Sequence, residues 1–246
     1  MRPNNEDAFR LLPDRGLFIV SDGIGGGHAG ETAAKIVVQT LPPMLLDRFC
    51  VNSSKGTGSS SSEAPRDSVE VTKLILRDTI VELSQLIWKQ SSGQPGLSGM
   101  GATLVLACIR GDHAYIAHMG DSRAYRYRQN ELELLTQDHS VVGILLRDRK
   151  ITDEEARHHP ARGSLSRFMG MQGVVYPDVQ DFKLAAGDRL LLCSDGLTGM
   201  LPDRVIARTL ETERAPETAC KALVEAANGN GGKDNITVVV GEWLGA

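Results

Sequence analysis

The sequence lacks the features that mark membrane-spanning, secreted or disulfide-linked proteins. No apolar run in its 246 residues approaches the roughly 20 residues that a membrane-spanning helix needs, and the N-terminus has no signal-peptide pattern. The four cysteines show neither CxxC pairs nor the spacing of a disulfide framework: Cys50, Cys108, Cys193 and Cys220. We therefore expect no membrane attachment, and reduced, buried thiols in a cytoplasmic protein.

Blocks of basic residues are also missing. The net charge is −4 and the pI about 5.9, whereas proteins bind the phosphate backbone of nucleic acids through clustered Lys and Arg. Nucleic acid is therefore not an expected partner. The hydrophobic fraction of 41% and the charged fraction of 24% are ordinary for a globular protein that buries a sizeable core.

Helical patterns occur in the first third of the chain. Residues 29–41 predict a helix that Pro42 and Pro43 interrupt, and residues 69–89 predict a second helix with apolar residues at spacings of three and four. Between them, residues 52–66 are rich in Ser and Gly and have too few apolar residues to offset the entropy of ordering them. We expect a mobile loop there rather than a domain boundary.

The rest of the chain is mainly β in character. Residues 143–173 are rich in Arg and Gly and predict a surface flap that borders a cleft, with a short helix at 151–159 that Thr152 and Glu155 cap. Short apolar runs predict strands at 17–20, 103–109, 113–119, 123–128, 132–135, 179–184, 189–193 and 236–240, and helices are expected at 202–209 and 216–227. This order is not the alternation of a parallel sheet, so we predict one α+β domain over 1–246, an antiparallel sheet sandwich covered by helices.

One stretch, Ser21 to Glu31, reads as a strand end, a glycine-rich loop and a helix start. It places Asp22 at the strand end and contains a GxGxxG pattern from Gly25 to Gly30. No βαβ unit with an acidic residue about 20 positions later follows, so a dinucleotide loop is disfavoured. The loop could be a simple connection, or it could hold the Asp22 carboxylate rigidly in a site.

Acidic residues recur at strand ends in a way that favours the site. Asp22, Asp121, Asp195 and Asp234 each lie at or beside the end of an expected strand, and Glu6 and Asp7 add a further acidic position. Packed together, these like charges would repel unless cations neutralise them. Oxygen ligands without His or Cys select Mg²⁺, Mn²⁺ or Ca²⁺, and two such ions can activate a water for attack on phosphorus. Arg2 would suit the phosphate.

Six motifs occur in an order that covers nearly the whole chain: RPNNEDAF at 2–9, SDGIGGGHAGE at 21–31, GMGATL at 99–104, MGDSRAY at 119–125, SDGLTGML at 194–201 and GGKDNITVVV at 231–240. Together they resemble the motifs of the metal-dependent protein serine/threonine phosphatases, also called PPM or type 2C phosphatases, and in particular their bacterial branch. The resemblance implies a central β-sandwich of two antiparallel sheets flanked by helix pairs, with metals in a cleft at one end.

The resemblance also implies roles. Asp22 looks like the carboxylate that bridges both metals and the Gly23 carbonyl like a ligand of the second, while Asp195 and Asp234 look like ligands of the first. The remaining positions are assigned in the same way: Glu6 and Asp7 resemble the acidic pair that holds metal-bound waters, Asp121 the ligand of a third metal, and Arg2 the phosphate-binding arginine.

Three departures from the family pattern concern the N-terminus and the histidines. The family commonly has a strand before the arginine, whereas Arg2 is the second residue here, so the chain is a fragment, its start is misassigned, or the sheet lacks its first edge strand. Ile24 stands where eukaryotic relatives often carry a histidine, and His28 is interpreted as a helix-start residue. His118 stands where asparagine is frequent and is interpreted as structural.

The function that the resemblance implies is Mn²⁺- or Mg²⁺-dependent hydrolysis of phosphoserine and phosphothreonine in proteins by a metal-bridging hydroxide, without a phosphoenzyme. The expected partners are phosphorylated proteins and an opposing Ser/Thr kinase. Two other functions stay open at this point. One is a metal-binding regulatory module of the same fold with little activity, and the other, disfavoured by the absence of a basic strip, is a metal-dependent nuclease.

Overall fold

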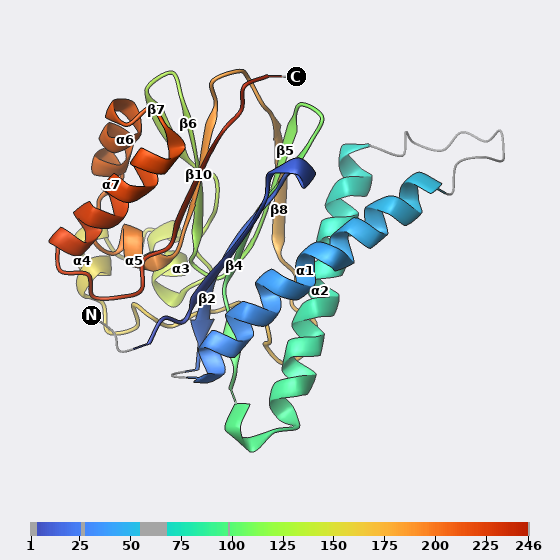
Figure 1. Cartoon of the computed structure of the whole chain (residues 1–246). Helices are drawn as coiled ribbons and strands as arrows, with labels where there is room; N and C mark the ends of the chain where they lie inside the picture. Colours follow the sequence, from blue (N-terminus) through green and yellow to red (C-terminus); the bar gives the residue numbers. More distant parts are fainter. Residues whose placement is uncertain (1–3, 26–27, 55–67, 98, 246) are drawn as a thin grey trace.

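Two antiparallel β-sheets lie face to face, and a pair of helices covers the outer face of each (Figure 1). The computed structural model describes residues 4–25, 28–54, 68–97 and 99–245. The expected α+β sandwich flanked by helix pairs is therefore confirmed. None of the helices in these ranges is both long enough and apolar enough to cross a bilayer.

The first sheet has the strand order β1-β2-β4-β5-β8, with β3 paired to β2. Its strands are β1 (Asp7–Leu12), β2 (Leu17–Ile24), β3 (Gly101–Ala102), β4 (Leu104–Arg110), β5 (His113–Met119) and β8 (Asp178–Lys183). The short 3₁₀ turn Pro13–Arg15 joins β1 to β2. Strand β1 was missed by the sequence analysis, because its apolar residues Phe9 and Leu11 are exposed and do not alternate cleanly.

The second sheet has the order β10-β9-β6-β7. Its strands are β6 (Arg123–Arg128), β7 (Glu131–Leu134), β9 (Arg189–Cys193) and β10 (Val238–Glu242). The helices are α1 (His28–Ser54) and α2 (Val69–Ser92) on the first sheet, α6 (Asp203–Thr212) and α7 (Pro216–Gly229) on the second, and the short helices α3 (Val141–Arg147), α4 (Asp153–His158) and α5 (Asp195–Thr198). A further 3₁₀ turn spans Pro95–Leu97.

Side chains alternate between two cores along each central strand. In β2, Leu17 and Ile19 pack among the residues of α1 and α2, whereas Val20 packs between the two sheets. In β4, Leu106 packs among the residues of the helix pair, whereas Ala107 packs between the two sheets. Because successive side chains of a strand point to opposite faces, near-continuous apolar runs are needed where both faces are covered. Three layers of apolar packing therefore hold the strand ends in place.

Two expectations for the first helix pair need correction. Helix α1 does not stop at Pro42 and Pro43 but continues to Ser54, since Leu45 and Phe49 are buried in the same core as the first half of the helix. Tertiary packing outweighs the local cost of the prolines. Residues 55–67, which make up most of the expected mobile loop, lie outside the described residues. Cys50 is exposed rather than buried.

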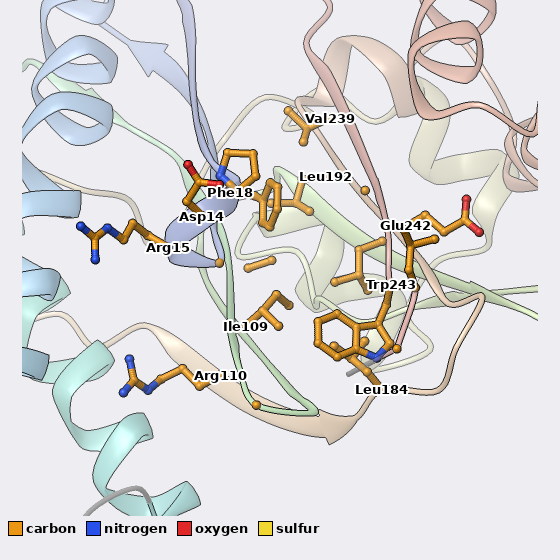
Figure 2. Close-up of a pocket in the computed structure, with 18 of the residues that line it drawn as sticks. Asp14, Arg15, Phe18, Ile109, Arg110, Leu184, Leu192, Val239, Glu242 and Trp243 are labelled. Atoms are coloured by element: carbon orange, nitrogen blue, oxygen red, sulfur yellow. The ribbon is translucent and has the colours of Figure 1, made fainter.

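A cavity of about 880 Å³ opens between the two sheets. It lies beside β10, which is the end strand of the second sheet in the part of the chain that the structure describes. Figure 2 shows Phe18 and Ile109 of the first sheet facing Leu192 and Val239 of the second across this space, with Trp243 at its side. The inter-sheet core is therefore incompletely filled at this end. The expectation that the first sheet lacks the edge strand that the family commonly has before the position of Arg2 stays a prediction, because residues 1–3 lie outside the described residues.

Glycines let three backbone segments approach closely at the other end of the sandwich. A Cβ atom on Gly23 would lie 2.2 Å from the carbonyl oxygen of Gly30, and one on Gly30 would lie 2.7 Å from Oε2 of Glu6. A Cβ atom on Gly196 would lie 1.8 Å from the carbonyl oxygen of Asn235. Only glycine permits such contacts. They bring the end of β2, the start of α5 and the segment before β10 together.

We expect Gly196→Ala to lower the free energy of unfolding by about 1–3 kcal/mol, because the new methyl group must displace the Asn235 backbone. Gly229→Ala is the matched control, since a Cβ atom at this last residue of α7 would have no heavy atom within 4 Å. Urea denaturation of both variants measures the difference. Equal midpoints for Gly196→Ala and Gly229→Ala would contradict this account of the close approach.

Candidate metal centre

The first two carboxylates of the centre are a cross-strand pair. Asp7 of β1 lies directly opposite Asp22 of β2, so their side chains project from the same face of the sheet. The Ser194 hydroxyl donates to Oδ2 of Asp7 at 2.8 Å. The N–H of Asp22 donates to Oγ1 of Thr103 at 2.9 Å, which fixes the end of β2 against β4. Two acidic groups are thus held beside each other by the sheet itself.

Two further aspartates enter from the second sheet. Asp195 begins α5 directly after β9, and Asp22 lies within hydrogen-bonding reach of both Asp195 and Asp7. Asp234 precedes β10, and its charge acts on Asp7, Asp22 and Asp195. Asp121 follows β5 through Gly120 and interacts with Asp22 and Asp195. The structure therefore brings together the aspartates that the sequence analysis selected.

Burial and mutual repulsion raise the pKa values of this group. Burial is the largest cause and raises the pKa of Asp22 to about 10 and that of Asp121 to about 7, with the neighbouring carboxylates adding to both shifts. The pKa values of Asp7 and Asp195 are raised for the same reasons. Without a compensating positive charge, the centre favours protonated carboxyls at neutral pH.

Two oxygens of the centre are buried and have no hydrogen-bond partner among the described residues: Oδ1 of Asp7 and Oδ1 of Asp195. An unpaired buried carboxylate oxygen is costly, and a divalent cation would satisfy it. The donors gathered here are carboxylate and carbonyl oxygens, which suit Mg²⁺ and Mn²⁺. The residues present therefore fit a centre for hard divalent cations.

Backbone contacts hold the remaining predicted residues beside the aspartates. Glu6 is buried, its N–H donates to Oδ1 of Asn235 at 3.0 Å, and its carbonyl accepts from the N–H of Gly23 at 3.1 Å. The Gly23 carbonyl oxygen lies near Gly30 at the start of α1. Arg2, the predicted phosphate ligand, lies outside the described residues. His28 begins α1 with its imidazole 96% exposed, as its interpretation as a helix-start residue requires.

The expected flap is more regular than predicted. It contains α3 as well as α4, and α4 has the expected capping box between Thr152 and Glu155. The positive charge of the flap residue Arg162 acts on Asp195, and its guanidinium lies beside the position of a Cβ atom on Gly199, one turn further along. Arg147 donates instead to Gln137, and Arg167 to Asp178.

Sequence reasoning missed the residues that hold the carboxylates. Thr103 and Ser122 share a hydroxyl–hydroxyl bond of 2.6 Å that links the start of β4 to the turn between β5 and β6, and Ser194 joins β9 to β1. Asn235 bridges the N-terminal segment to the C-terminal one through Glu6 and Asn4. For Ser122, Ser194 and Asn235 the available signal was their adjacency to an aspartate, whereas Thr103 has no acidic neighbour in the sequence.

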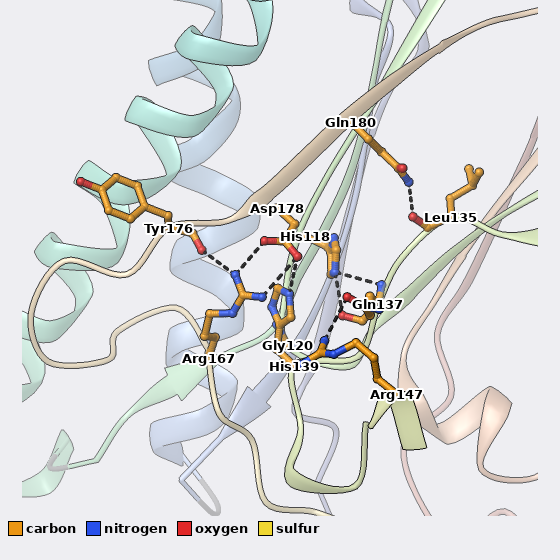
Figure 3. A network of polar contacts seen from close by, with 10 residues as sticks. All are labelled: His118, Gly120, Leu135, Gln137, His139, Arg147, Arg167, Tyr176, Asp178 and Gln180. Atoms are coloured by element: carbon orange, nitrogen blue, oxygen red, sulfur yellow. Dashed lines mark hydrogen bonds and ion pairs between the residues drawn. The ribbon is translucent and has the colours of Figure 1, made fainter. Parts of the chain in front are cut away.

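A second group of possible metal ligands lies beside this centre. His118, His139 and Asp178 offer ligand atoms that all lie within 4.8 Å of one another, and both histidines are buried (Figure 3). Nε2 of His118 lies 2.9 Å from the carbonyl oxygen and 3.2 Å from the backbone nitrogen of Gln137, and its tautomer decides which of the two hydrogen bonds forms; the ring stacks on His139. These contacts agree with the structural interpretation of His118.

Comparison with known proteins finds a family model, relatives and solved structures that match nearly the whole chain. The family model described as "Protein phosphatase 2C" matches residues 3–235. The serine/threonine phosphatase stp of Listeria monocytogenes is 34% identical over 245 residues, which cover 98% of this chain and 91% of the relative. A solved structure of the PstP catalytic domain in complex with two manganese ions is 31% identical, with a TM-score of 0.75 and coverage of 98% of this chain and 93% of that one. The phosphatase MsPP of Mycobacterium smegmatis, solved with cacodylate, is 31% identical, with a TM-score of 0.71 and coverage of 97% and 92%.

We expect Mn²⁺ to stabilise the protein more at pH 8 than at pH 5. The unfolded carboxyls lose their protons near pH 3.8, whereas the folded chain keeps them up to about pH 7 at Asp121 and about pH 10 at Asp22. The folded state therefore binds more protons, and the free energy of unfolding of the cation-free protein falls as the pH rises through this window. Bound Mn²⁺ removes the repulsion. At one hundred times its Kd it adds about 2.7 kcal/mol, or about 5–10 °C in Tm at pH 8.

Thermal melts in chelator and in Mn²⁺ at the two pH values test this expectation. Asp22→Asn is the informative variant, because asparagine has nearly the same volume but no carboxyl group that must take up a proton on folding at pH 8. In chelator at pH 8, the Tm of this variant should be higher than that of the wild type. Mn²⁺ should raise the Tm of the variant much less than it raises that of the wild type. A wild-type Tm that Mn²⁺ changes equally at both pH values, or does not change, would speak against a carboxylate centre that needs cations.

Proposed function

The chain belongs to the protein phosphatase 2C family and is a protein serine/threonine phosphatase, and from this premise we propose how its own residues carry out the reaction. The substrates are phosphoserine and phosphothreonine side chains of proteins, and water attacks without a covalent phosphoenzyme. The observation that carries the proposal is the buried carboxylate cluster with its two unpaired oxygens. The PstP structure with two manganese ions supports a pair of cations at such a cluster.

In this proposal, Asp22, which lies between Asp7 and Asp195, would contribute its carboxylate to both cations. Asp195 and Asp234, which approach from the second sheet, would hold one cation, and the Gly23 carbonyl would hold the other. Glu6 and Asp7 would hold the waters of the cations, and Asp121 would add a ligand for a third. When bound, Mn²⁺ or Mg²⁺ supplies an activated water at neutral pH and offsets the negative charge of the phosphoryl group.

The remaining residues position the substrate. Arg2 binds the phosphate through bidentate hydrogen bonds from its guanidinium group, as the sequence analysis predicts. Arg162 adds a second positive charge from the flap, on the side of Asp195, where its field already acts. Ile24 offers no proton to the leaving alkoxide, so a water must do so. The opposing enzyme in the cell is a Ser/Thr kinase, since only such an enzyme makes this substrate.

The regulatory module of the same fold loses support from the comparisons. The relatives that match over nearly the whole chain carry the names of active phosphatases, and the carboxylate set is complete here. A chromogenic aryl phosphate assayed with and without Mn²⁺ separates the two functions. Hydrolysis that requires the cation supports the enzyme, and cation binding without hydrolysis would support the module.

We predict that Asp195→Ala lowers kcat/KM for a phosphothreonine peptide at least about a hundredfold in Mn²⁺, because it removes a proposed ligand whose loss cannot be compensated locally. Asp14→Ala is the control. Asp14 lies in the turn after β1, at the opposite end of the hairpin from Asp7, and is exposed. Undiminished turnover of Asp195→Ala would rule out the assignment.

For the flap, we predict that Arg162→Ala lowers kcat/KM for the phosphopeptide about tenfold, the effect of losing one charge-assisted hydrogen bond to phosphate. Arg149→Ala should change it less than twofold, since Arg149 is an exposed arginine between α3 and α4. Steady-state kinetics on both variants provide the comparison. Equal values for the two variants would remove Arg162 from the substrate site.

A further inference from the structure

The turn that carries Asp121 depends on an unusual glycine. Gly120 follows β5 with a φ of +111°, and a Cβ atom there would lie 2.7 Å from Cγ2 of Thr103. A glycine is therefore needed on both conformational and steric grounds. Asp121 directly follows Gly120, so the direction of its carboxylate depends on what fixes the Gly120 backbone.

His139 fixes Gly120 with both its backbone and its side chain. The N–H of His139 donates to the carbonyl of Gly120 at 2.9 Å, and the N–H of Gly120 donates to Nδ1 of His139 at 3.3 Å. The imidazole is only 2% exposed and stacks on His118 with ring centroids 4.5 Å apart. The ring is therefore confined, and its orientation decides whether it can accept the bond from Gly120.

The other side of the ring is held by a charged pair. Because Nδ1 accepts from Gly120, the ring proton is on Nε2, and it is donated to Oδ2 of Asp178 at 3.0 Å. Arg167 binds the same carboxylate through both of its terminal nitrogens, at 2.7 and 3.2 Å (Figure 3). The chain of contacts runs from Arg167 at the end of the flap, through Asp178 and His139, to Gly120.

The charge states of His139 and Asp178 agree with a hydrogen bond donated by the imidazole to the carboxylate. Burial lowers the pKa of His139 to about 4, so its ring is neutral at physiological pH. Burial alone would raise the pKa of Asp178, but the bonds from Arg167 and His139 lower it to about 2. A charged carboxylate thus orients a neutral imidazole, the arrangement by which proteins commonly fix the tautomer of a histidine.

The same three groups could instead bind a transition metal, and two observations oppose that alternative. Nε2 of His139 carries the proton, so it has no lone pair to offer while Gly120 donates to Nδ1. Arg167 already contacts both oxygens of Asp178, and its positive charge would repel a cation. Orientation of the Gly120 turn accounts for the contacts that join Arg167, Asp178 and His139 to Gly120.

We propose that Asp178 and Arg167 are positioning residues that act through His139 to hold the Gly120–Asp121 turn, and so set the affinity for the cation bound by Asp121. This rests on the proposed function, because Asp121 matters in this way only if the carboxylate cluster binds cations. The N–H of Ser166 also donates to the carbonyl of His139, at 2.8 Å. His139 therefore forms hydrogen bonds with both the flap and the turn that carries Asp121.

The test measures Mn²⁺ binding by calorimetry together with the Mn²⁺ dependence of phosphopeptide hydrolysis. Asp178→Asn and Arg167→Gln should weaken the weakest Mn²⁺ site about tenfold and raise the Mn²⁺ concentration for half-maximal activity by the same factor, with tighter sites unchanged. High Mn²⁺ should restore most of the rate. Arg167→Lys keeps the positive charge but loses the planar guanidinium that contacts both oxygens of Asp178. Its Mn²⁺ affinity at the weakest site should lie between those of wild type and Arg167→Gln.

Two controls separate the possible failures. Asp181→Asn removes a carboxylate of the same strand that pairs with Lys73, and it should leave Mn²⁺ binding unchanged. Asp121→Asn should abolish the weakest site. If Asp121→Asn does so but Asp178→Asn and Arg167→Gln, folded by their thermal melts, bind Mn²⁺ like wild type, the positioning role is wrong while the proposed function stands. If Asp121→Asn and Asp22→Asn also bind like wild type, the proposed function itself is wrong.

One further titration addresses the metal alternative. With Mn²⁺ absent, Zn²⁺ is added to wild type and to His118→Asn. Equal binding by the two proteins supports the positioning role. A Zn²⁺ site that His118→Asn removes would overturn it, because the imidazoles would then act as ligands.

Discussion

The repulsion among buried carboxylates is the constraint on which the functional end of this protein depends. Asp7, Asp22, Asp121 and Asp195 all have raised pKa values because burial and neighbouring charges disfavour their ionised forms. A fold would not gather these groups for stability alone, since isolated buried charges are costly. Bound cations would offset this cost, and in the proposed function the same cations supply the chemistry of phosphate hydrolysis. The proposal thus couples stability and catalysis through one cluster.

The architecture around the cluster explains how strands from two sheets can meet there. Apolar side chains on both faces of β2 and β4 hold the first sheet between the helix pair and the second sheet, so the strand ends are fixed by packing. At those ends glycines remove the side chains that would keep backbones apart, at Gly23 against Gly30 and at Gly196 against Asn235. Short polar side chains, such as Thr103 and Ser194, then orient the carboxylates. The opposite end of the sandwich instead has an apolar cavity between the two sheets (Figure 2).

The sequence predicted the sandwich, most of its strands and the carboxylates that meet, because apolar runs and acidic strand ends are local patterns. It did not predict β1, whose apolar residues are exposed, nor the passage of α1 through Pro42 and Pro43, which depends on distant packing at Leu45 and Phe49. It also gave no sign that His139, Asp178 and Arg167 form one network, because these residues are brought together only by the folded flap. Contacts between residues far apart in sequence need the structure.

Anomalous diffraction from crystals of this protein soaked in Mn²⁺ is the measurement that tests the central claim most directly. The account predicts at least two manganese peaks in contact with Asp22, one of them also in contact with Asp195 and Asp234. A further peak is predicted beside Asp121, and none between His118 and His139. Manganese bound elsewhere, with the carboxylates of Asp22 and Asp195 free of it, would contradict the claim that cations compensate this cluster.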